Sequence, residues 1–460
     1  MTHYDLLVIG AGPAGEKAAI QAAKLGKSVL VVDKREHLGG NSLHTGTIPS
    51  KTLRESVRFI ERMRNRAVYG ISVHLDKDLT VNRLMHRKNA AVASLTERLE
   101  SSFDRNDIDH FRGTARFVDE HHVEVSDPNG AKDTYEMGIA VIATGSRPYR
   151  PDIVNFEQER VRDSDTILQI NRIPKTLTIF GAGVIGCEYA TIFSNLGVKV
   201  NLINPRQNLL DYLDLEISTA LSYLMRESGV RIRLGEALQA VECDEENVHA
   251  HLESGKVLRS DYLLYANGRT GNTDYLGLEQ LGLPVNSRKQ LDVNDFFQTA
   301  VPNVYAVGDV IGFPSLAATS MEQGRLAALH AFDGLKEPPK RHLLPTGIYT
   351  IPEISTVGAT EEELTRDKVP YEVGTATYRE IAKGQIVGNT TGRLKLLFHR
   401  ETLKLLGVHI LGEGATDLVH IGQTVMGFDG TIEFFIGNVF NYPTYSECYR
   451  VAALNGVNRL

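Results

Sequence analysis

The stretch LLVIGAGPAGEKAAIQAAKLGKSVLVVD, residues 6–33, decides the fold of this chain. An apolar run enters a GxGxxG turn, a helical pattern follows at 16–25, and a second apolar run at 28–32 ends at Asp33. Glycines at such a turn permit a tight bend, so that the free N–H groups at the helix start can hold a pyrophosphate. A carboxylate at the end of the second strand accepts hydrogen bonds from ribose hydroxyls and repels a 2′-phosphate. The stretch therefore predicts a βαβ unit that binds a dinucleotide with an unphosphorylated adenosine ribose.

The pattern recurs at TLTIFGAGVIG, residues 176–186, with a helical pattern at 187–196 and a strand at 199–203. One glycine-rich turn is a weak signal, but two copies, each led by a strand and followed by a helix, predict two bound dinucleotides. The second copy ends at Asn204, with Arg206 close behind, instead of at an acid. A neutral Asn204 can bond a hydroxyl without repelling phosphate, and Arg206 could pair with one, so we expect a site that accepts both NADH and NADPH. A loop asparagine beside a solvated arginine is the open alternative.

Further along the chain, the pattern indicates how the units are connected. Apolar strands near 138–145, 262–268 and 304–309 indicate that the second nucleotide unit is inserted into the first. A change of pattern after Pro338-Pro339 predicts a separate final domain of mixed strands and helices. We therefore expect an α/β fold with two Rossmann-like units and a C-terminal α+β domain. The expected boundaries are 1–150 and 271–337 for the first unit, 151–270 for the second, and 338–460 for the last domain.

Composition restricts the class of protein. The 460 residues are 42% hydrophobic and 23% charged, and no apolar run approaches the ~20 residues that span a bilayer, so we expect no membrane span. The first residues lack the basic start of a secretory signal, which favours a cytoplasmic location. A net charge of −7 disfavours nucleic acid as a partner. Three distant cysteines offer neither a disulfide framework nor a metal site.

This layout resembles the FAD-dependent pyridine-nucleotide disulfide oxidoreductases over essentially the whole chain. Besides the first glycine turn and Asp33, the resemblance rests on three short stretches: an expected turn at Gly113-Thr114-Ala115, then Thr144-Gly145 and Val307-Gly308-Asp309. It implies non-covalent FAD in the first unit, with Asp309 at the ribityl or pyrophosphate part of the cofactor. It also implies that the C-terminal domain forms a two-fold homodimer or a larger homo-oligomer.

The chain departs from those oxidoreductases where their thiol chemistry takes place. They carry a CxxxxC redox disulfide before Pro-Ser-Lys, whereas GNSLHTGTIPSK, residues 40–51, has Ser42 and Thr47 in place of both cysteines. A hydroxyl cannot cycle between thiol and disulfide, so reduction of a disulfide substrate by the usual exchange is excluded. Their C-terminal His-Pro base is likewise replaced by Tyr442-Pro443. The combination is similar to the soluble pyridine nucleotide transhydrogenases, which share residues 46–51 and the ending 441–456.

That similarity implies hydride transfer between NADPH and NAD through the flavin, with one nicotinamide site used twice in a ping-pong cycle. It implies that Lys51 and Glu188 form the catalytic ion pair beside the flavin. A helix starting near Ala317 could aim its positive end at the flavin, although small residues there could equally reflect packing. A diaphorase or NAD(P)H oxidase, a non-catalytic redox sensor and a dihydrolipoamide dehydrogenase remnant without cysteines remain open alternatives.

The expected cofactor-binding residues come from both nucleotide units, and no metal ligand is expected. They are Gly10, Gly12, Gly15, Asp33, Lys34, Gly40, Ser42, Thr47, Lys51, Ala115, Thr144, Gly145, Asp309 and Ala317 for FAD, and Gly181, Gly183, Ile185, Gly186, Asn204, Arg206 and Gly268 for NAD and NADP as substrates.

Overall fold

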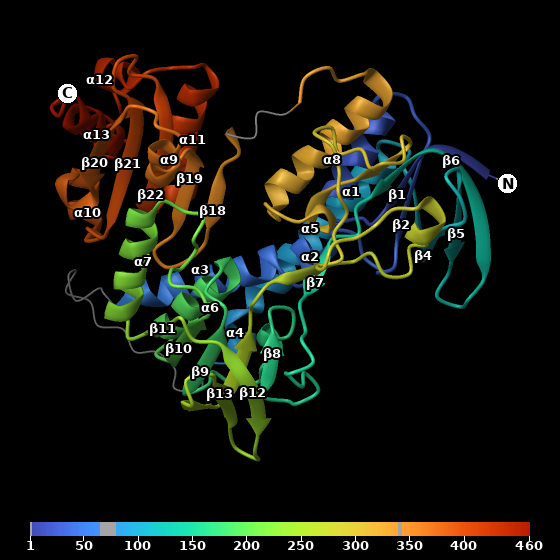
Figure 1. Cartoon of the computed structure of the whole chain (residues 1–460), viewed down its shortest axis with the longest axis horizontal. Coiled ribbons are helices and arrows are strands. Elements are labelled where there is room, and N and C mark those ends of the chain that lie inside the picture. The colour runs from blue at the N-terminus through green and yellow to red at the C-terminus, as the bar shows by residue number, and fades with distance from the viewer. Residues whose placement is uncertain (1, 65–79, 339–342) are drawn as a thin grey trace.

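The computed structural model describes residues 2–64, 80–338 and 343–460 of the chain. Three lobes are visible in Figure 1: the first nucleotide unit at the right, the second at the bottom, and the C-terminal domain at the upper left. Each lobe is built on its own sheet, and helices cover the sheets. This architecture confirms the predicted fold class. Pro339, part of the predicted linker, lies outside the described residues.

The first lobe contains a seven-stranded sheet in the order β3-β2-β1-β6-β5-β4, with β17 beside β6. The last four residues of β1, Leu6–Ile9, and most of β2 are buried on both faces, as their continuous apolar side chains require in a parallel sheet. Helices α1 and α8 lie side by side (Figure 1), and a Cβ on Gly324 of α8 would overlap the backbone of Ala14 in α1. The elements of this lobe are β1 (Thr2–Ile9), α1 (Pro13–Lys24), β2 (Val29–Asp33), α2 (Gly40–His44), α3 (Thr47–Arg64), α4 (Val81–Leu84), α5 (His86–Asp104), β3 (Asp109–Arg112), β4 (Thr114–Phe117), β5 (His122–Ser126), β6 (Lys132–Ile142), β17 (Val304–Ala306) and α8 (Ala317–Asp333).

The second lobe is a parallel five-stranded sheet in the order β11-β10-β9-β15-β8, beside a smaller antiparallel sheet of β12, β13 and β14. Helix α3 of the first lobe packs onto it, because Leu53 and Val57 share a core cluster with Ile179 and Phe193. This helix therefore connects the two nucleotide units through apolar contacts. The elements of the lobe are β8 (Val161–Asp163), β9 (Thr176–Phe180), α6 (Val184–Asn195), β10 (Lys199–Asn204), α7 (Leu215–Glu227), β11 (Arg231–Leu234), β12 (Leu238–Cys243), β13 (Val248–Leu252), β14 (Val257–Ser260) and β15 (Tyr262–Tyr265).

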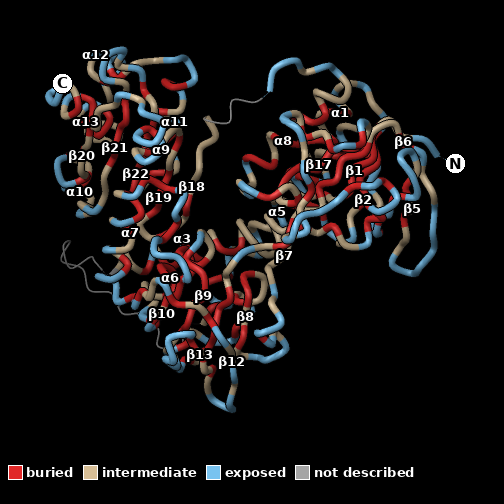
Figure 2. Tube along the Cα trace, in the orientation of Figure 1, coloured by how far each residue is buried: buried red, intermediate tan, exposed pale blue. Residues whose placement is uncertain are grey.

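The C-terminal lobe is an antiparallel five-stranded sheet in the order β18-β19-β22-β21-β20, packed against α11 and α13. Its own core includes Phe398, Phe435 and Tyr449, each fully buried. Figure 2 shows a buried interior in each lobe and exposed tube at the lobe edges. The elements are β18 (Thr346–Ile348), β19 (Ile354–Gly358), α9 (Glu361–Arg366), β20 (Tyr371–Thr377), α10 (Ala382–Val387), β21 (Gly392–His399), β22 (Leu405–Gly412), α11 (Ala415–Gly427), α12 (Glu433–Gly437) and α13 (Glu447–Val457).

The chain enters and leaves the second lobe along one narrow ribbon. Strand β7 (Ser146–Pro148) pairs antiparallel with β16 (Arg269–Gly271), so the outgoing and returning segments lie next to each other. An ion pair between Arg147 and Asp274, at 2.5 Å, fastens the ribbon on the side of the first lobe. The two crossings of the chain are therefore adjacent in space although more than a hundred residues separate them in sequence.

A buried charge cluster connects the second lobe to the C-terminal lobe. The ammonium of Lys395, on β21, is fully buried and donates to both carboxylate oxygens of Asp214, at the start of α7, at 2.9 Å. It also pairs with Glu216 and Glu361. The cation therefore stands among three carboxylates that come from two lobes.

Several sequence expectations differ from the structure in detail. The two glycine-turn helices begin at Pro13 and Val184, earlier than predicted, because the last glycine of each motif lies inside the first helical turn. The prediction of a turn at Gly113–Ala115 is wrong, since Thr114 and Ala115 both lie in β4, where the side chain of Ala115 is buried. The strand predicted at 262–268 ends at Tyr265. Among the described residues, none of the helices has the length and apolar character needed to cross a membrane.

Candidate active site between the two nucleotide units

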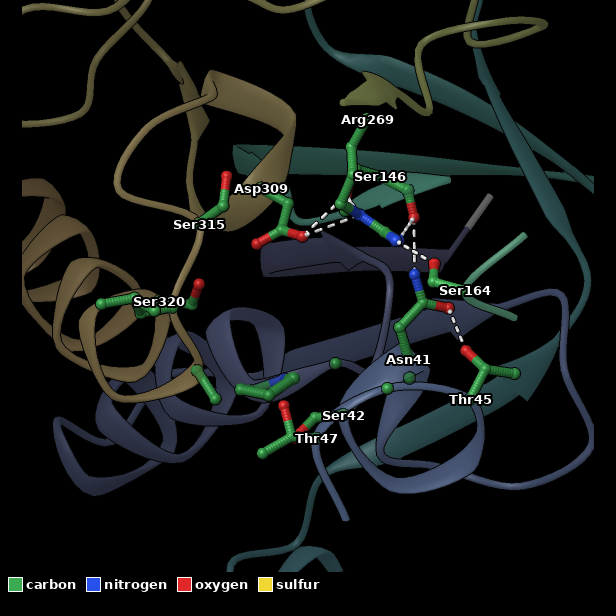
Figure 3. A pocket seen from close by; sticks show the side chains of 18 of the residues that line it. Asn41, Ser42, Thr45, Thr47, Ser146, Ser164, Arg269, Asp309, Ser315 and Ser320 are labelled. Carbon is green, nitrogen blue, oxygen red and sulfur yellow. Dashed lines mark hydrogen bonds and ion pairs between the residues drawn. The ribbon is translucent and has the colours of Figure 1, made fainter. Parts of the chain in front are cut away.

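A cavity of about 730 Å³ lies where the three lobes meet. Both glycine turns open into it, with Gly12 on one side and Gly183 on the other. The C-terminal lobe contributes Gly347 and Tyr349 to the wall. Figure 3 shows polar side chains of this wall, from α2, β7 and the segments before α8, directed toward one another. One cavity thus serves both predicted dinucleotide turns.

The two turns have nearly the same backbone geometry. Gly10 has a φ of +107° and Gly181 a φ of +106°, a conformation that residues with a Cβ rarely adopt. A Cβ at Gly15 or Gly186 would lie less than 3.0 Å from the carbonyl oxygen of Gly10 or Gly181, respectively. Glycine is therefore required at these positions by close backbone packing, and the helix N-termini can approach a pyrophosphate.

The first unit meets the requirements of an adenine dinucleotide. The carboxylate of Asp33 accepts hydrogen bonds from the N–H groups of Ala11 at 2.7 Å and Arg35 at 2.8 Å, which fixes it at the end of β2. Within the described part of the chain, one guanidinium nitrogen of Arg35 and the hydroxyl of Thr144 are buried without a partner, and both residues line the cavity. Buried polar atoms of this kind normally have partners, so these two offer hydrogen bonds to a bound group. The residues present therefore fit FAD.

A second polar cluster surrounds Asp309. Its carboxylate accepts a hydrogen bond from the Ser146 hydroxyl at 2.6 Å, and Arg269 donates to that same hydroxyl at 2.7 Å (Figure 3). The amide of Asn41 donates to the backbone oxygen of Ser146. Arg269 also lies 3.9 Å from Asp165, where burial raises the pKa of the carboxyl. The cluster fixes Asp309 at the cavity wall, where a polar part of a cofactor can bond to it.

The predicted ion pair between Lys51 and Glu188 is present. The Lys51 ammonium lies 2.7 Å from Oε2 of Glu188, and the Glu188 side chain is only 6% exposed. Oε1 of Glu188 accepts the N–H of Tyr349 from the C-terminal lobe at 2.9 Å, and the ring centroid of Tyr349 is 4.9 Å from the ammonium. Burial raises the pKa of the Tyr349 phenol. Residues from all three lobes therefore surround one cation at the cavity wall.

The cavity wall carries hydroxyls where thiol chemistry would need sulfur. Ser42 and Thr47 both line it, whereas Cys187, Cys243 and Cys448 are absent from its described lining. Burial raises the pKa of Cys187 and of Cys448, the latter to about 12, so neither forms a thiolate near neutral pH. This arrangement cannot support dithiol exchange.

Asn204, the last residue of β10 in the second unit, is buried, and both polar atoms of its side chain form hydrogen bonds. Asn204 accepts the N–H of Ala182 at 3.4 Å and donates to the carbonyls of Asn208 at 2.9 Å and Arg206 at 3.3 Å. Arg206 itself is 69% exposed and pairs with Asp211 at 2.5 Å. Asn204 therefore organises the loop after β10, and the guanidinium stands in solvent at its edge.

The structure brings most of the predicted residues to the cavity, but not all of them. The residues outside its lining belong to the buried parts of the turns, to β4, to the end of β10 and to the exposed loop after it. Those that line it are Gly10, Gly12, Asp33, Lys34, Gly40, Ser42, Thr47, Lys51, Thr144, Gly145, Asp309, Ala317, Gly183, Ile185, Glu188 and Gly268, and those that do not are Gly15, Ala115, Gly181, Gly186, Asn204 and Arg206.

Sequence reasoning missed residues that reach the site from distant segments. Arg269 follows a predicted strand directly, a position that could have marked it. Tyr349 and Phe313 gave no local signal. Phe313 is 76% exposed and meets the ring of Tyr212 edge-on, with 5.7 Å between centroids, although the two belong to different lobes. Such contacts depend on the packing of the lobes.

Comparison with known proteins covers the whole chain. Residues 4–324 match the pyridine nucleotide-disulphide oxidoreductase family, and residues 344–453 match the dimerisation domain of that family. The soluble pyridine nucleotide transhydrogenase of Vibrio parahaemolyticus is 50% identical over 466 residues, covering 100% of this chain and 99% of the relative. The protein of the same description from Colwellia psychrerythraea is 48% identical, covering 99% and 98%. That of Yersinia pestis is 50% identical, covering 100% and 99%.

Solved structures support the same grouping. LpdA from Mycobacterium tuberculosis superimposes with a TM-score of 0.91 at 23% identity, covering 99% of both chains, which shows the shared fold. The HOCl-induced flavoprotein disulfide reductase RclA from Escherichia coli, solved as a Cu(II) complex, has a TM-score of 0.88 at 27% identity, again covering 99% of both chains. The match to a dimerisation domain supports a homo-oligomer. The chain therefore belongs to the pyridine nucleotide-disulphide oxidoreductase family and, within it, groups with the soluble pyridine nucleotide transhydrogenases.

Proposed function

We propose that this protein transfers hydride between NADPH and NAD+ through a non-covalently bound FAD. The observation that carries the proposal is one shared cavity: both dinucleotide turns open into it, the cation of Lys51 lines it, and the hydroxyls of Ser42 and Thr47 stand where the redox cysteines would be. The site has two nucleotide units and no redox thiols among its described lining residues. The reaction that these units support is therefore hydride transfer between a flavin and a nicotinamide. The relatives that are described as soluble pyridine nucleotide transhydrogenases support the same reaction class.

The first unit is proposed to hold FAD. The fixed carboxylate of Asp33 would bind the adenosine ribose, the turn at Gly12 would hold the pyrophosphate, and Asp309 would accept a hydrogen bond from the ribityl chain. Arg35 and Thr144 supply buried donors without partners in the described chain. When bound, FAD would supply the redox chemistry for passing hydride from one nicotinamide to another.

The second unit is then the only remaining turn for a nicotinamide dinucleotide in the described chain. Donor and acceptor must occupy it in succession, with the oxidised donor leaving before the acceptor binds, which is a ping-pong order. NAD and NADP are both substrates in this scheme. The neutral Asn204 and the exposed Arg206 are consistent with a site that admits both.

Lys51 and Glu188 are proposed as the catalytic pair. The ammonium of Lys51 supplies positive charge in a partly buried cavity, where electrostatic interactions are stronger than in water. Glu188 holds that ammonium in place through one oxygen, and the backbone of Tyr349 holds the other oxygen. Neither residue needs to gain or lose a proton during hydride transfer.

The remaining proposals concern assembly. The C-terminal domain is proposed to form a two-fold homodimer, with larger assemblies built from it, and a cytoplasmic location is proposed. We propose the boundaries 1–150 and 271–337 for the FAD-binding domain, 151–270 for the NAD(P)-binding domain and 338–460 for the dimerisation domain. The β7–β16 ribbon, where the chain passes between the first two lobes, lies at the limits of this division.

Anaerobic stopped-flow absorbance tests the proposed function. The flavin of the purified protein is reduced with NADPH and then mixed with thio-NAD, whose reduction has its own absorbance. Fast rates in both half-reactions, sufficient for steady turnover, are the expected result. If NADPH reduces the flavin but only oxygen or a quinone reoxidises it, the protein is a diaphorase or oxidase instead.

A further inference from the structure

The loop after β10 carries an ion pair whose role the proposed hydride transfer leaves unexplained. One guanidinium nitrogen of Arg206 lies 2.5 Å from Oδ2 of Asp211. The two side chains are 69% and 42% exposed, so water and ligands reach both. The pair lies within the ten-residue loop, residues 205–214, that connects β10 to α7.

The backbone beneath this pair is fixed by other contacts. The buried amide of Asn204 donates to the carbonyls of Arg206 and Asn208, which holds the first part of the loop. At the other end, the ring of Tyr212 contacts Phe313 and Leu213 is buried. The carboxylate of Asp211 therefore has no structural task in holding the loop, and its replacement should leave the fold intact.

The pair lies where the adenosine end of a dinucleotide is expected. In a βαβ nucleotide unit, the ribose of a dinucleotide bound at the glycine turn lies at the end of the second strand, which here is β10. An arginine there can pair with a 2′-phosphate, and a guanidinium binds a carboxylate with the same forked geometry. Asp211 and a 2′-phosphate are therefore competitors for one cation.

We propose that Asp211 acts as an internal substitute for the 2′-phosphate and so brings the affinities for NAD and NADP closer together. With NAD bound, Arg206 stays paired with Asp211. With NADP bound, the phosphate displaces the carboxylate from Arg206, and part of the gain in phosphate binding is lost in breaking the pair. A site that must bind both dinucleotides in one catalytic cycle, and release each, benefits from similar affinities. The inference rests on the proposed use of this site by both nucleotides.

The test compares binding of NADP+ and NAD+ to the oxidised, flavin-loaded protein by isothermal titration calorimetry. Exposed ion pairs contribute little, so Asp211→Asn is expected to tighten NADP+ binding by about two- to fivefold and to leave NAD+ unchanged. In an Arg206→Ala background, Asp211→Asn should have no effect on NADP+ affinity, because the cation for which the carboxylate and the phosphate compete is gone. Unchanged or weaker NADP+ binding in the single variant would overturn the inference.

A matched control separates competition from a general change in charge. Glu279 forms a similarly exposed pair with Arg116 at 3.1 Å, far from the second unit. Glu279→Gln removes the same charge and should change neither affinity. Equal tightening of NAD+ and NADP+ by Asp211→Asn would reduce the role of Asp211 to a nonspecific charge effect. Because binding is measured without turnover, failure of the stopped-flow test would contradict hydride transfer while these affinities still decide the role of Asp211.

Discussion

The two nucleotide units have the same backbone geometry at their glycine turns and differ in the residue at the end of the second strand. In the first unit, Asp33 accepts one backbone N–H from the glycine turn, at Ala11, and one from the loop after β2, at Arg35. In the second, Asn204 accepts one N–H and donates to two carbonyls, so the loop after β10 presents acceptors. Both strand-end side chains therefore accept an N–H of their own glycine turn, but the loop after β2 offers Asp33 a donor and the loop after β10 offers Asn204 acceptors.

The units differ also in how they are held. The first is packed on α8 by close helix contact, with small residues at the crossing. The second is fastened to the C-terminal lobe through Asp214 and Lys395, and through Glu188 and Tyr349. Its position relative to the cavity thus depends on charged contacts across a lobe boundary as well as on the apolar contacts of α3. The variants below test these differences, beginning with the largest expected effect.

Replacing Lys395 should destabilise the second unit most. Lys395→Met leaves the buried carboxylate of Asp214 without its cation, and breaking a buried pair in this way costs about 3–5 kcal/mol. The urea unfolding midpoint, followed by circular dichroism, should fall accordingly. The control is Lys132→Met in the first unit, whose exposed pair with Glu124 should change stability by less than about 1 kcal/mol. If the two variants lowered the unfolding midpoint equally, the buried ion pair of the second unit would contribute no more to stability than an exposed pair of the first.

The same cluster predicts a dependence of stability on pH. Although burial alone would raise it, the neighbouring His409 and Lys395 hold the pKa of Asp214 below its usual value. A carboxyl with a lowered pKa stabilises the fold above its unfolded pKa of about 3.9 and loses this contribution as pH falls through the folded pKa. The fall in stability on acidification should therefore be smaller in Asp214→Asn than in the unchanged protein. An identical acid profile would show that Asp214 does not couple to folding.

The glycine turns give the next largest effect and separate the two ligands. Gly15→Ala should lose flavin, measured by absorbance near 450 nm, whereas Gly186→Ala should keep flavin and bind NAD+ about tenfold to a hundredfold more weakly. The reason is the same in both, a Cβ that overlaps a carbonyl of the turn. Gly427→Ala, at a position with no atom within 4 Å of the added Cβ, is the control. Loss of flavin in both glycine variants would mean that the two units do not bind independently.

Replacing Lys51 has a smaller predicted effect, which is confined to the rate of flavin reduction. Lys51→Ala should retain FAD but slow flavin reduction by NADPH by about tenfold or more, since one preorganised charge is lost from the site. Lys51→Arg keeps the charge and should recover part of the rate. Glu188→Gln tests the positioning role and should slow the same step less than Lys51→Ala. Unchanged reduction kinetics in Lys51→Ala would exclude the residue from the mechanism.

The smallest effect comes from exchanging the two strand-end residues. An ionised aspartate at position 204 cannot donate to the carbonyls of Arg206 and Asn208, and it repels a 2′-phosphate. Asn204→Asp should therefore weaken NADP+ binding by about threefold relative to NAD+. Asp33→Asn removes one acceptor from the first unit and should loosen FAD modestly. If Asn204→Asp changes the affinities for NADP+ and NAD+ equally, another residue of the loop discriminates between the two dinucleotides.

Local sequence was sufficient to predict the parts of the fold that depend on backbone geometry. The two glycine turns were predictable because Gly10 and Gly181 need a positive φ that few residues adopt. The ion pair of Lys51 and Glu188 was expected only through resemblance, since 137 residues separate the partners. Their catalytic role stays a prediction.

Other features could not be predicted because they arise from contacts between lobes. Tyr349 bonds Glu188 across 161 positions, and Lys395 bonds Asp214 across 181. Neither segment has a local pattern that indicates a partner. Ala115 was misread because Gly113 and Thr114 favour a turn, while pairing of β4 with β5 extends the chain there. Tertiary contacts override local preference at such positions.

The β7–β16 ribbon makes the second lobe exchangeable as a cassette. Both chain crossings lie on neighbouring strands, so a recombinant chimaera needs only two joints, at Ser146–Pro148 and at Arg269–Gly271, and these joints face each other. Grafting a nucleotide unit of different coenzyme preference at these joints would retarget the protein without rebuilding its flavin site. The graft would have to carry an acid at position 188 and another at position 214, because the recipient supplies Lys51 and Lys395 to meet them.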